Sequence, residues 1–228
     1  MTRLYEMLVR VLMLAPYGIH WNKERWINAR SAKNTIQLCK YLGVTPKSLM
    51  DVGANNSQWA YWIKRKWPGI HITSVEPHPD FNPIGDEKIR DIAFSDNNLD
   101  EGQKMTSEGM SSHLDPDGIV PVTVMRADCL FLGLKQKRPS ILKVDCETHT
   151  YRALSGFGDY LNEFDIIVVE MWNHSPNADL GYQQSDIWKL MLKHGKQTCR
   201  IVDCEWTSKN GFAYYDAAFY NTNSFPIN

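Results

Sequence analysis

Acidic side chains lie at the ends of four apolar stretches of this sequence: Asp51, Glu76, Asp145 and Glu170. A carboxylate in such a position can bind a cation, accept hydrogen bonds from hydroxyl groups, or remove a proton as a general base. If the stretches are parallel strands, the four carboxylates would lie along one edge of a sheet. That edge is where open α/β sheets bind their ligands.

Hydrophobic periodicity predicts the elements that would hold these carboxylates. Short apolar runs bounded by Gly, Pro and polar residues indicate strands, and a 3.6-residue repeat indicates helices. Residues 95–120 are polar and rich in Gly, Ser and Asp, so we expect a long loop or a small excursion there. We predict strands over residues 48–52, 70–76, 88–94, 122–126, 141–144, 166–169, 199–206 and 212–220, and helices over 31–42, 57–67, 128–134, 151–161 and 185–194.

The alternation of strands and helices predicts an α/β domain with a mainly parallel sheet and helices on both faces. Asn210-Gly211 between the last two strands is typical of a hairpin, which should add an antiparallel strand at one edge. We expect a helical extension over residues 1–43 and the α/β domain over residues 44–228. Residues 4–14 have the spacing of an amphipathic helix, which would pack on the domain or join two copies of the chain.

Composition limits the class of protein. The 228 residues are 43% hydrophobic and carry a net charge of −1, so nothing in the global charge favours nucleic acid as a partner. No apolar stretch is long enough to span a bilayer, and the N-terminal residues lack the pattern of a cleaved targeting signal. We therefore expect a cytoplasmic protein without a transmembrane segment.

The stretch SLMDVGANNSQWA, residues 48–60, predicts a strand, a tight turn at Gly53 and a helix. A dinucleotide site would need further glycines for the pyrophosphate, but Asn55 stands where the second would fall, and Asp51 would repel the phosphates. S-Adenosylmethionine carries an ammonium and a sulfonium and no phosphate, so Asp51 would attract it. We therefore predict S-adenosylmethionine as the cofactor.

Neighbouring polar residues suit other parts of this cofactor. Glu76, at the end of the second strand, can accept hydrogen bonds from both ribose hydroxyls. Asn55, Asn56 and Ser57 can cap the following helix, whose free N–H groups can take the methionine carboxylate. We expect Gly53 to be required because a Cβ at this position would crowd the ligand.

Five motifs together resemble one family. LMDVGANNSQWA, SVEPHPDF, IAFSD, ILKVDCETHTYRALSG and DIIVVEMW follow the order of the motifs of the FkbM-type methyltransferases, over residues 45–175. The resemblance implies the Rossmann-like class I methyltransferase fold and methyl transfer to a hydroxyl of a sugar, polyketide or other small molecule. The cofactor site expected from the loop and the resemblance consists of Asp51, Gly53, Ala54, Asn55, Glu76, Ala93 and Asp145, with Ala93 near the adenine.

One motif departs from the family pattern. Where the family has Glu-Gly-x-Glu, this chain has Glu147-Thr148-His149-Thr150. Methyl transfer to oxygen is an in-line displacement, in which a general base helps by removing the hydroxyl proton. Asp145, Glu147 and His149 lie at or just beyond the end of a central strand and are the candidate catalytic residues. The sequence leaves the choice of base among them open.

The acceptor is expected to bind at two polar segments. One lies within the long loop over residues 95–120, and the other follows the predicted strand over residues 166–169. There an aromatic ring could stack on a sugar, while Ser, Asn and His supply hydrogen bonds. The predicted acceptor-binding residues are Ser112, His113, Trp172, Asn173 and His174.

A metal site is a further possibility. Mg²⁺ prefers carboxylate and amide oxygens, which Asp145, Glu170 and Asn173 could provide. The Glu-Met-Trp-Asn spacing fits poorly with such sites, and the five scattered cysteines offer no zinc motif, so we expect no bound metal.

The sequence therefore predicts an S-adenosylmethionine-dependent O-methyltransferase acting on a small-molecule hydroxyl, in first place a sugar in a glycan or glycoconjugate. A catalytically degenerate S-adenosylmethionine-binding module is the alternative, favoured by the replacements Thr148 and Thr150. A less favoured alternative is an NAD-dependent oxidoreductase.

Overall fold

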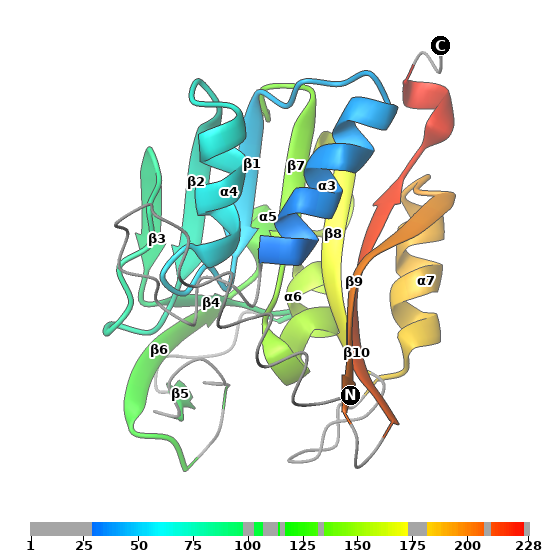
Figure 1. Ribbon diagram of the computed structural model, residues 1–228. Helices are drawn as coiled ribbons and strands as arrows, with labels where there is room; N and C mark the ends of the chain where they lie inside the picture. Colours follow the sequence, from blue (N-terminus) through cyan, green and yellow to red (C-terminus); the bar gives the residue numbers. More distant parts are fainter. Residues whose placement is uncertain are drawn as a thin grey trace, which may run out of the picture.

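A seven-stranded sheet forms the centre of the molecule (Figure 1). The computed structural model describes residues 29–97, 103–106, 114, 117–131, 135–172, 182–207 and 211–225, without the side chains of 205–207 and 211–213. The strand order is β3-β2-β1-β7-β8-β10-β9, and all neighbours are parallel except that β10 runs antiparallel to both β8 and β9. The strands are β1 (Ser48–Val52), β2 (His71–Glu76), β3 (Glu87–Arg90), β7 (Ser140–Val144), β8 (Ile166–Trp172), β9 (Thr198–Thr207) and β10 (Gly211–Tyr220).

Helices cover both faces of this sheet, which confirms the predicted fold class (Figure 1). Every residue of β1 and β7 is buried, because these central strands are covered from both sides. Leu49 and Ile141 pack on the face of α3 and α4, whereas Met50 and Leu142 pack on the opposite face. The α-helices are α3 (Ala29–Tyr41), α4 (Gln58–Lys66), α5 (Ala127–Leu130), α6 (Thr150–Gly156) and α7 (Gln184–Lys193), and the short 3-10 helices are η2 (Glu147–His149), η3 (Gly158–Glu163) and η4 (Thr222–Ser224).

The order of the strands fixes where a ligand can bind. From β1 the chain first builds outward through β2 and β3, and β7 then lies on the other side of β1. The order therefore reverses between β1 and β7, and the crevice outside the carboxyl ends of these two strands is the expected ligand site.

The predicted strand over residues 88–94 is wrong in one respect. It is two strands, β3 and β4 (Ile92–Phe94), separated by Asp91 at φ +60°. β3 stays in the main sheet, while β4 pairs with β6 (Val120–Met125) in a second sheet that β5 (Gln103–Met105) completes. A left-handed residue ends regular pairing, and the chain leaves the main sheet there.

The closing hairpin is confirmed, but its antiparallel strand does not lie at the edge. β10 inserts between β8 and β9, so β9 is the edge strand. The reason is burial: Ala217, Ala218 and Phe219 of β10 are fully buried, whereas Ile201 of β9 is 58% exposed. An apolar run that buries both faces takes an inner position, and a mixed run tolerates the edge.

Several predictions fall outside the described residues or stay open. The amphipathic pattern of residues 4–14 lies outside them, as do Ser112, His113, Asn173 and His174. The predicted helix over 151–161 is α6 followed by η3, whose first residue, Gly158, has φ +50°. Among the described residues, no helix has the length and apolar character needed to cross a membrane.

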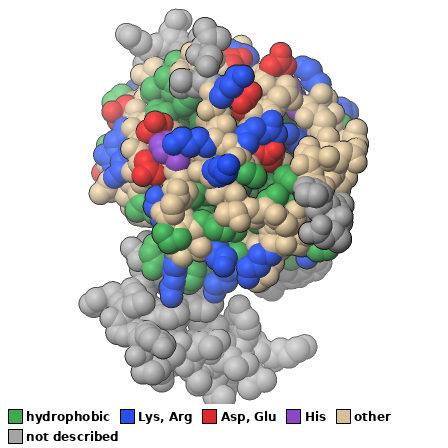
Figure 2. Space-filling view, turned by 90° about the horizontal axis from the view of Figure 1, so that it is seen from above, with side chains coloured by type: hydrophobic (Ala, Val, Ile, Leu, Met, Phe, Trp, Pro, Cys, Tyr) green, Lys and Arg blue, Asp and Glu red, His purple; other side chains and the backbone are tan. Residues whose placement is uncertain are grey.

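Exposed lysines lie at one end of the main sheet. Lys47 and Lys137 precede β1 and β7, and Lys40 and Lys66 lie at the ends of α3 and α4; all four are exposed. Figure 2 views this amino end of the strands, where Lys and Arg side chains gather. The carboxylates singled out in the sequence lie at the opposite end.

Candidate functional site

The turn after β1 is shaped by the neighbouring strand. Gly53 has φ +74°, and its amide donates to the carbonyl of Val75 (3.0 Å). A Cβ on Gly53 would lie 1.8 Å from the carbonyl oxygen of Asp145, whose own amide donates to Val52 (3.0 Å). Glycine is thus needed here because the backbone after β7 approaches this closely; that a Cβ would also crowd a ligand stays a prediction.

The predicted cap of α4 is wrong. Ser57 occupies the N-cap position at φ 58°, but its side chain makes no capping hydrogen bond. Its hydroxyl instead accepts from the amide of Ile84 (2.8 Å), and the side-chain oxygen of Asn55 accepts from the amide of Asn56 (2.7 Å). The first N–H groups of α4 therefore have no cap from Ser57, and an anionic group bound at the start of the helix could use them.

Glu76 joins the two loops that border the crevice. One carboxylate oxygen accepts from the amide of Asn55 (2.6 Å), and the other accepts from the amide of His78 (2.9 Å). Burial raises the pKa of Glu76, and these two hydrogen bonds act against that rise. Since a carboxylate offers about four lone-pair sites, Glu76 can still accept hydrogen bonds from hydroxyl groups.

Asp51 is a buried carboxylate without a partner. It is 2% exposed, and its Oδ2 has no hydrogen-bond partner among the described residues. Burial raises its pKa to about 7; Lys143 opposes the rise, and the charges of Asp145 and Glu76 add to it. An unpaired carboxylate in the interior is costly, and a cation in the crevice would remove that cost.

Lys143 lies on β7 directly opposite Asp51 and is also buried. Its ammonium contacts the carboxylate of Asp145 (Nζ–Oδ2 2.8 Å) and lies 3.9 Å from that of Asp216. Burial acts to raise the pKa of Asp145, but Lys143 and a hydrogen bond with Glu170 outweigh burial and lower it. Asp145 is therefore ionised at neutral pH.

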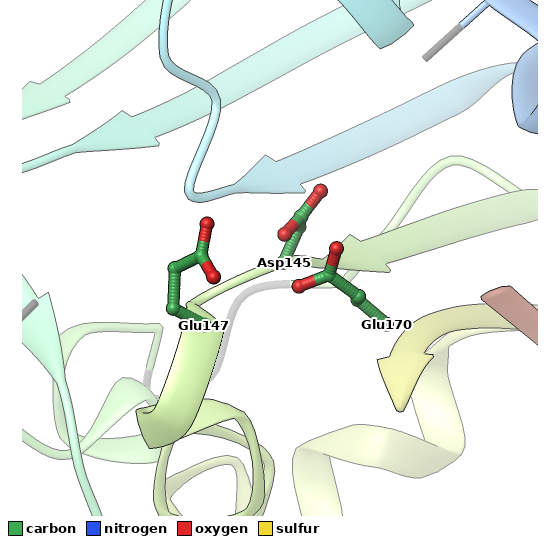
Figure 3. A group of neighbouring side chains, drawn as sticks. All are labelled: Asp145, Glu147 and Glu170. Carbon is green, nitrogen blue, oxygen red and sulfur yellow. The ribbon is translucent and has the colours of Figure 1, made fainter. Parts of the chain in front are cut away.

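Three carboxyl groups converge beside this ion pair. Figure 3 shows Asp145 at the end of β7, Glu147 at the start of η2 and Glu170 on β8 pointing toward one another. One carboxylate oxygen from each lies within 4.8 Å of the others. Oxygen ligands of this kind suit Mg²⁺ or Ca²⁺.

Protons can take the place of a cation in this group. Burial raises the pKa of Glu147 to about 8, with the charge of Asp145 adding to the rise. Burial and the charges of Asp145 and Glu147 raise the pKa of Glu170 well above its usual range. The hydrogen bond between Glu170 and Asp145 raises the pKa of the first and lowers that of the second, so Glu170 carries the proton and donates it.

The recorded contacts of His149 and Ala93 are with other residues. The Nε2 of His149 is 3.2 Å from the hydroxyl of Ser95. Burial and then the charge of Arg152 lower the pKa of His149 to about 4, so the ring is neutral at pH 7. Ala93 is buried in a cluster on the second sheet with Met105 and other apolar side chains.

The departures from the family motif are accommodated locally. Glu147 has φ +51°, whereas Thr148, at the family's glycine position, is not among the described residues with positive φ. The hydroxyl of Thr150 donates to the carbonyl of Glu147 (3.0 Å) and accepts from the amide of Cys146 (3.2 Å). Through these two hydrogen bonds, Thr150 stabilises the turn that contains Glu147.

Aromatic side chains border the carboxyl groups. The indole N–H of Trp172 donates to Glu170 (2.8 Å), and its ring lies 5.4 Å from that of Tyr214. The hydroxyl of Tyr182 is buried without a hydrogen-bond partner among the described residues, and burial, followed by the charge of Glu170, raises its pKa. Tyr182 stacks on Tyr151 at 5.4 Å.

The sequence interpretation assigned no role to Lys143, Asp216 or Tyr182. A signal for the first two was present, because each is a single charge inside an apolar strand, in SILKV and AYYDAAFY. A charge that interrupts a strand covered on both faces must be paired in the interior. No comparable signal marks Tyr182.

Comparison with known proteins adds the family. Residues 51–198 match the methyltransferase FkbM domain, and no curated protein sequence matches the chain. Similar solved structures include the plantazolicin methyltransferase BpumL in complex with SAH (12% identity, TM-score 0.46, covering 87% of this chain and 84% of that chain) and the N-terminal domain of EvdMO1 with SAH bound (9%, 0.47, 95% and 96%). Another is the precorrin-6y C5,15-methyltransferase from Geobacter metallireducens GS-15 (10%, 0.45, 91% and 92%). The FkbM match covers well over half of the sequence, and the chain belongs to the FkbM methyltransferase family.

Proposed function

We propose that this protein transfers a methyl group from S-adenosylmethionine to a hydroxyl of a small molecule, in first place a sugar in a glycan or glycoconjugate. The observation that carries the proposal is Asp51, a buried carboxylate with an unpartnered oxygen at the switch point of the sheet. Such a group attracts a cationic ligand and repels a diphosphate. A nicotinamide dinucleotide is disfavoured for that reason.

The residues around the crevice fit the other parts of the cofactor. The ammonium of its methionine moiety would lie near Asp51 and the ionised Asp145. The methionine carboxylate would use the free N–H groups at the start of α4. The ribose hydroxyls would donate to Glu76, which keeps acceptor capacity beyond its two backbone contacts.

Glu147 is the general base in this proposal. When bound, S-adenosylmethionine supplies a methyl group already activated by its sulfonium. Glu147 takes the proton of the acceptor hydroxyl, so the oxygen gains its new bond to carbon without keeping a positive charge. Its pKa of about 8 lies near working pH, where a base is effective. His149, with a pKa of about 4 and a contact to Ser95, is the weaker base.

The acceptor contacts predicted from the sequence remain part of this proposal. Trp172, held by Glu170, offers a partly exposed aromatic ring next to the carboxyl groups. Ser112, His113, Asn173 and His174 stay proposed acceptor contacts. A cytoplasmic location, the absence of a nucleic-acid partner and self-association through residues 4–14 likewise stay proposals that rest on the sequence.

A degenerate binding module is the second candidate function. Thr150, which replaces the family's second glutamate, serves the η2 turn and offers no carboxylate. If that glutamate were the essential base, this chain would bind the cofactor without turning it over. Glu147 is retained, however, and its position among Asp145 and Glu170 favours an active enzyme.

The experiment combines binding with turnover. Calorimetry with S-adenosylhomocysteine (SAH), the product that S-adenosylmethionine leaves after methyl transfer, measures cofactor binding. Formation of SAH from S-adenosylmethionine over a panel of glycans and glycosylated small molecules measures catalysis. Glu147→Gln should keep SAH affinity and lower turnover by about 10²–10⁴-fold, the usual contribution of a general base. Glu87→Gln, a carboxylate on β3 that is 61% exposed, is the matched control and should change neither.

Two other results would decide against this proposal. SAH binding without turnover on any acceptor would support the binding module. Micromolar binding of NAD without SAH binding would exclude a methyltransferase.

A further inference from the structure

Lys143 is a buried cation whose charge must be neutralised by fixed neighbours. Its side chain is 1% exposed, within a strand whose other residues are apolar or small. Removing an ammonium from water is costly unless carboxylates and hydrogen bonds replace the solvent. The identity of its partners therefore decides how charge is distributed in the site.

The contacts of Lys143 are unequal. Its Nζ is 2.8 Å from Asp145, at hydrogen-bond distance, and 3.9 Å from Asp216. Asp216 accepts a hydrogen bond from Ser31, whose hydroxyl in turn accepts from the indole N–H of Trp59 (3.1 Å). Asp216 is thus tied to α3 and α4 through Ser31 and Trp59. Asp145, the closer partner of Lys143, lies at the end of β7 beside the crevice.

One ammonium serves several carboxylates. Around the ion pair, Asp51 comes from β1, Glu170 from β8 and Asp216 from β10, and Glu147 follows β7. These groups cannot all be ionised next to a single positive charge in a buried site. The carboxylate closest to Nζ retains its charge, and Glu170 donates a hydrogen bond to it.

We infer that Lys143 is a positioning residue: its buried ammonium fixes the negative charge of the site on Asp145, and so makes the end of β7 a permanent binding point for the cationic end of the cofactor. The inference rests on the proposed function, since it assigns the charged end of the same ligand. It adds that cofactor affinity depends on a residue that does not touch the cofactor.

The test replaces the ammonium with an apolar group of similar length, Lys143→Met, and measures SAH binding by calorimetry from about pH 6 to about pH 9. Without Lys143, Asp145 is protonated at the lower pH and ionises as the pH rises. The ratio of the variant's Kd to that of the unchanged protein cancels the titration of the ligand itself. This Kd ratio should increase about tenfold for each pH unit by which the pH lies below the Asp145 pKa in the variant. It should approach one at the upper end of the pH range.

Lys196→Met is the matched control. Lys196 is also buried, but its ammonium donates to the carbonyl of Phe164, ahead of β8 at the other end of the sheet. Its Kd ratio should stay near one at every pH. A Lys143→Met ratio that is the same at all pH values, or that is one throughout, would overturn the inference.

A second variant covers the case in which Lys143→Met does not fold. Lys143→Met with Asp145→Asn removes both charges of the pair together, which buried pairs tolerate better than the loss of one partner. Measured at about pH 9, above the Asp51 pKa of about 7, its SAH affinity should equal that of Asp145→Asn alone, because Lys143 then acts only through Asp145. A further loss beyond Asp145→Asn would contradict the inference.

A titration without ligand separates this inference from the proposed function. The carboxyl carbon of Asp145, followed by NMR, should show an ionised group over the whole pH range in the unchanged protein. In Lys143→Met, or in Lys143→Gln if the first variant does not fold, it should titrate within that range. If the unchanged protein binds no SAH, the proposed function fails, while this titration still decides whether Lys143 fixes the charge.

Discussion

At the scale of single residues, the site depends on a few buried carboxylates and the one lysine that lies among them in the described structure. Asp145 keeps its charge because Lys143 is in contact, Glu170 keeps a proton, and Asp51 titrates near neutral pH. The three behave differently although all lie at strand ends, because each sees different neighbours at different distances. The binding of a cation is therefore a property of the group rather than of any one acid.

Asp51→Asn should change cofactor affinity and protein stability in opposite directions. Loss of the charge removes a charge-assisted contact and should weaken SAH binding by about 1.5–3 kcal/mol. The same change removes an unpaired buried carboxylate and should raise the free energy of unfolding at pH 8 by about 1 kcal/mol or more. Calorimetry and urea unfolding measure the two effects. Asp80→Asn, whose side chain is 78% exposed, is the control, and unchanged SAH affinity in Asp51→Asn would contradict the cofactor placement.

Metal chelation tests the oxygen group of Asp145, Glu147 and Glu170. We expect turnover to survive dialysis against EDTA, because Lys143 already neutralises Asp145 and Glu170 forms a hydrogen bond with it. The measurement is SAH release before and after chelation and after added Mg²⁺. A loss of activity that Mg²⁺ alone restores would instead assign these three side chains as metal ligands.

At the scale of elements, the positions of the carboxylates come from how tightly β1 and β7 approach each other. The turn at Gly53 lies against the backbone of Asp145, and Glu76 ties that turn to the end of β2. The loop geometry is thus held by contacts within the protein itself. A preformed loop spares the ordering cost that binding would otherwise carry.

A series of three glycines separates the two reasons for glycine in this turn. Gly53→Ala adds both a left-handed alanine and a clash with the carbonyl of Asp145, and should cost about 3 kcal/mol or more in unfolding free energy. Gly195→Ala has φ +72° but open space around it, and should cost about 1 kcal/mol. Gly69→Ala has open space and no positive φ, and should stay within about 0.5 kcal/mol. Urea unfolding measures all three, and equal costs at Gly53 and Gly195 would mean that the backbone of Asp145 moves aside.

At the scale of the whole molecule, the net charge is only −1, but the charged groups at the two ends of the sheet differ in burial. Exposed lysines lie at the amino end of the strands (Figure 2), and the buried carboxylates Asp51, Glu76 and Glu170 lie at the carboxyl end. Burial keeps the acids from being screened by solvent, so they act on the ligand and also on the stability of the fold. The stability of the protein should therefore depend on pH in a range where most proteins change little.

Between about pH 6.5 and pH 8.5 we expect the free energy of unfolding to fall by about 3 kcal/mol or more, because Asp51, Glu147 and the protonated Glu170 all contribute. Asp51 and Glu147 have folded-state pKa values of about 7 and 8, above those of the unfolded chain, so the folded state binds more protons and loses stability as the pH rises through them. His149 acts in the opposite sense, but only below its unfolded-state pKa of about 6.5. Urea unfolding at several pH values measures this slope. SAH should stabilise the protein more at pH 8 than at pH 6, and a stability that rises across this range would contradict the assignment.

The sequence by itself determined the α/β class, the strand–glycine–helix unit at residues 48–60 and the acids at the strand ends, because these follow from local periodicity, turn residues and the apolar content of each run. It also carried the family motifs, since these are contiguous stretches of the chain. Only the tertiary structure decided that the backbone of Asp145 leaves no room for a side chain at Gly53, and that β10 lies inside the sheet. It also decided that Lys143, rather than His149, governs the charge of the site. Each of these depends on distances between residues far apart in the chain, and the protonation of a buried group depends on those distances far more than on its own residue type.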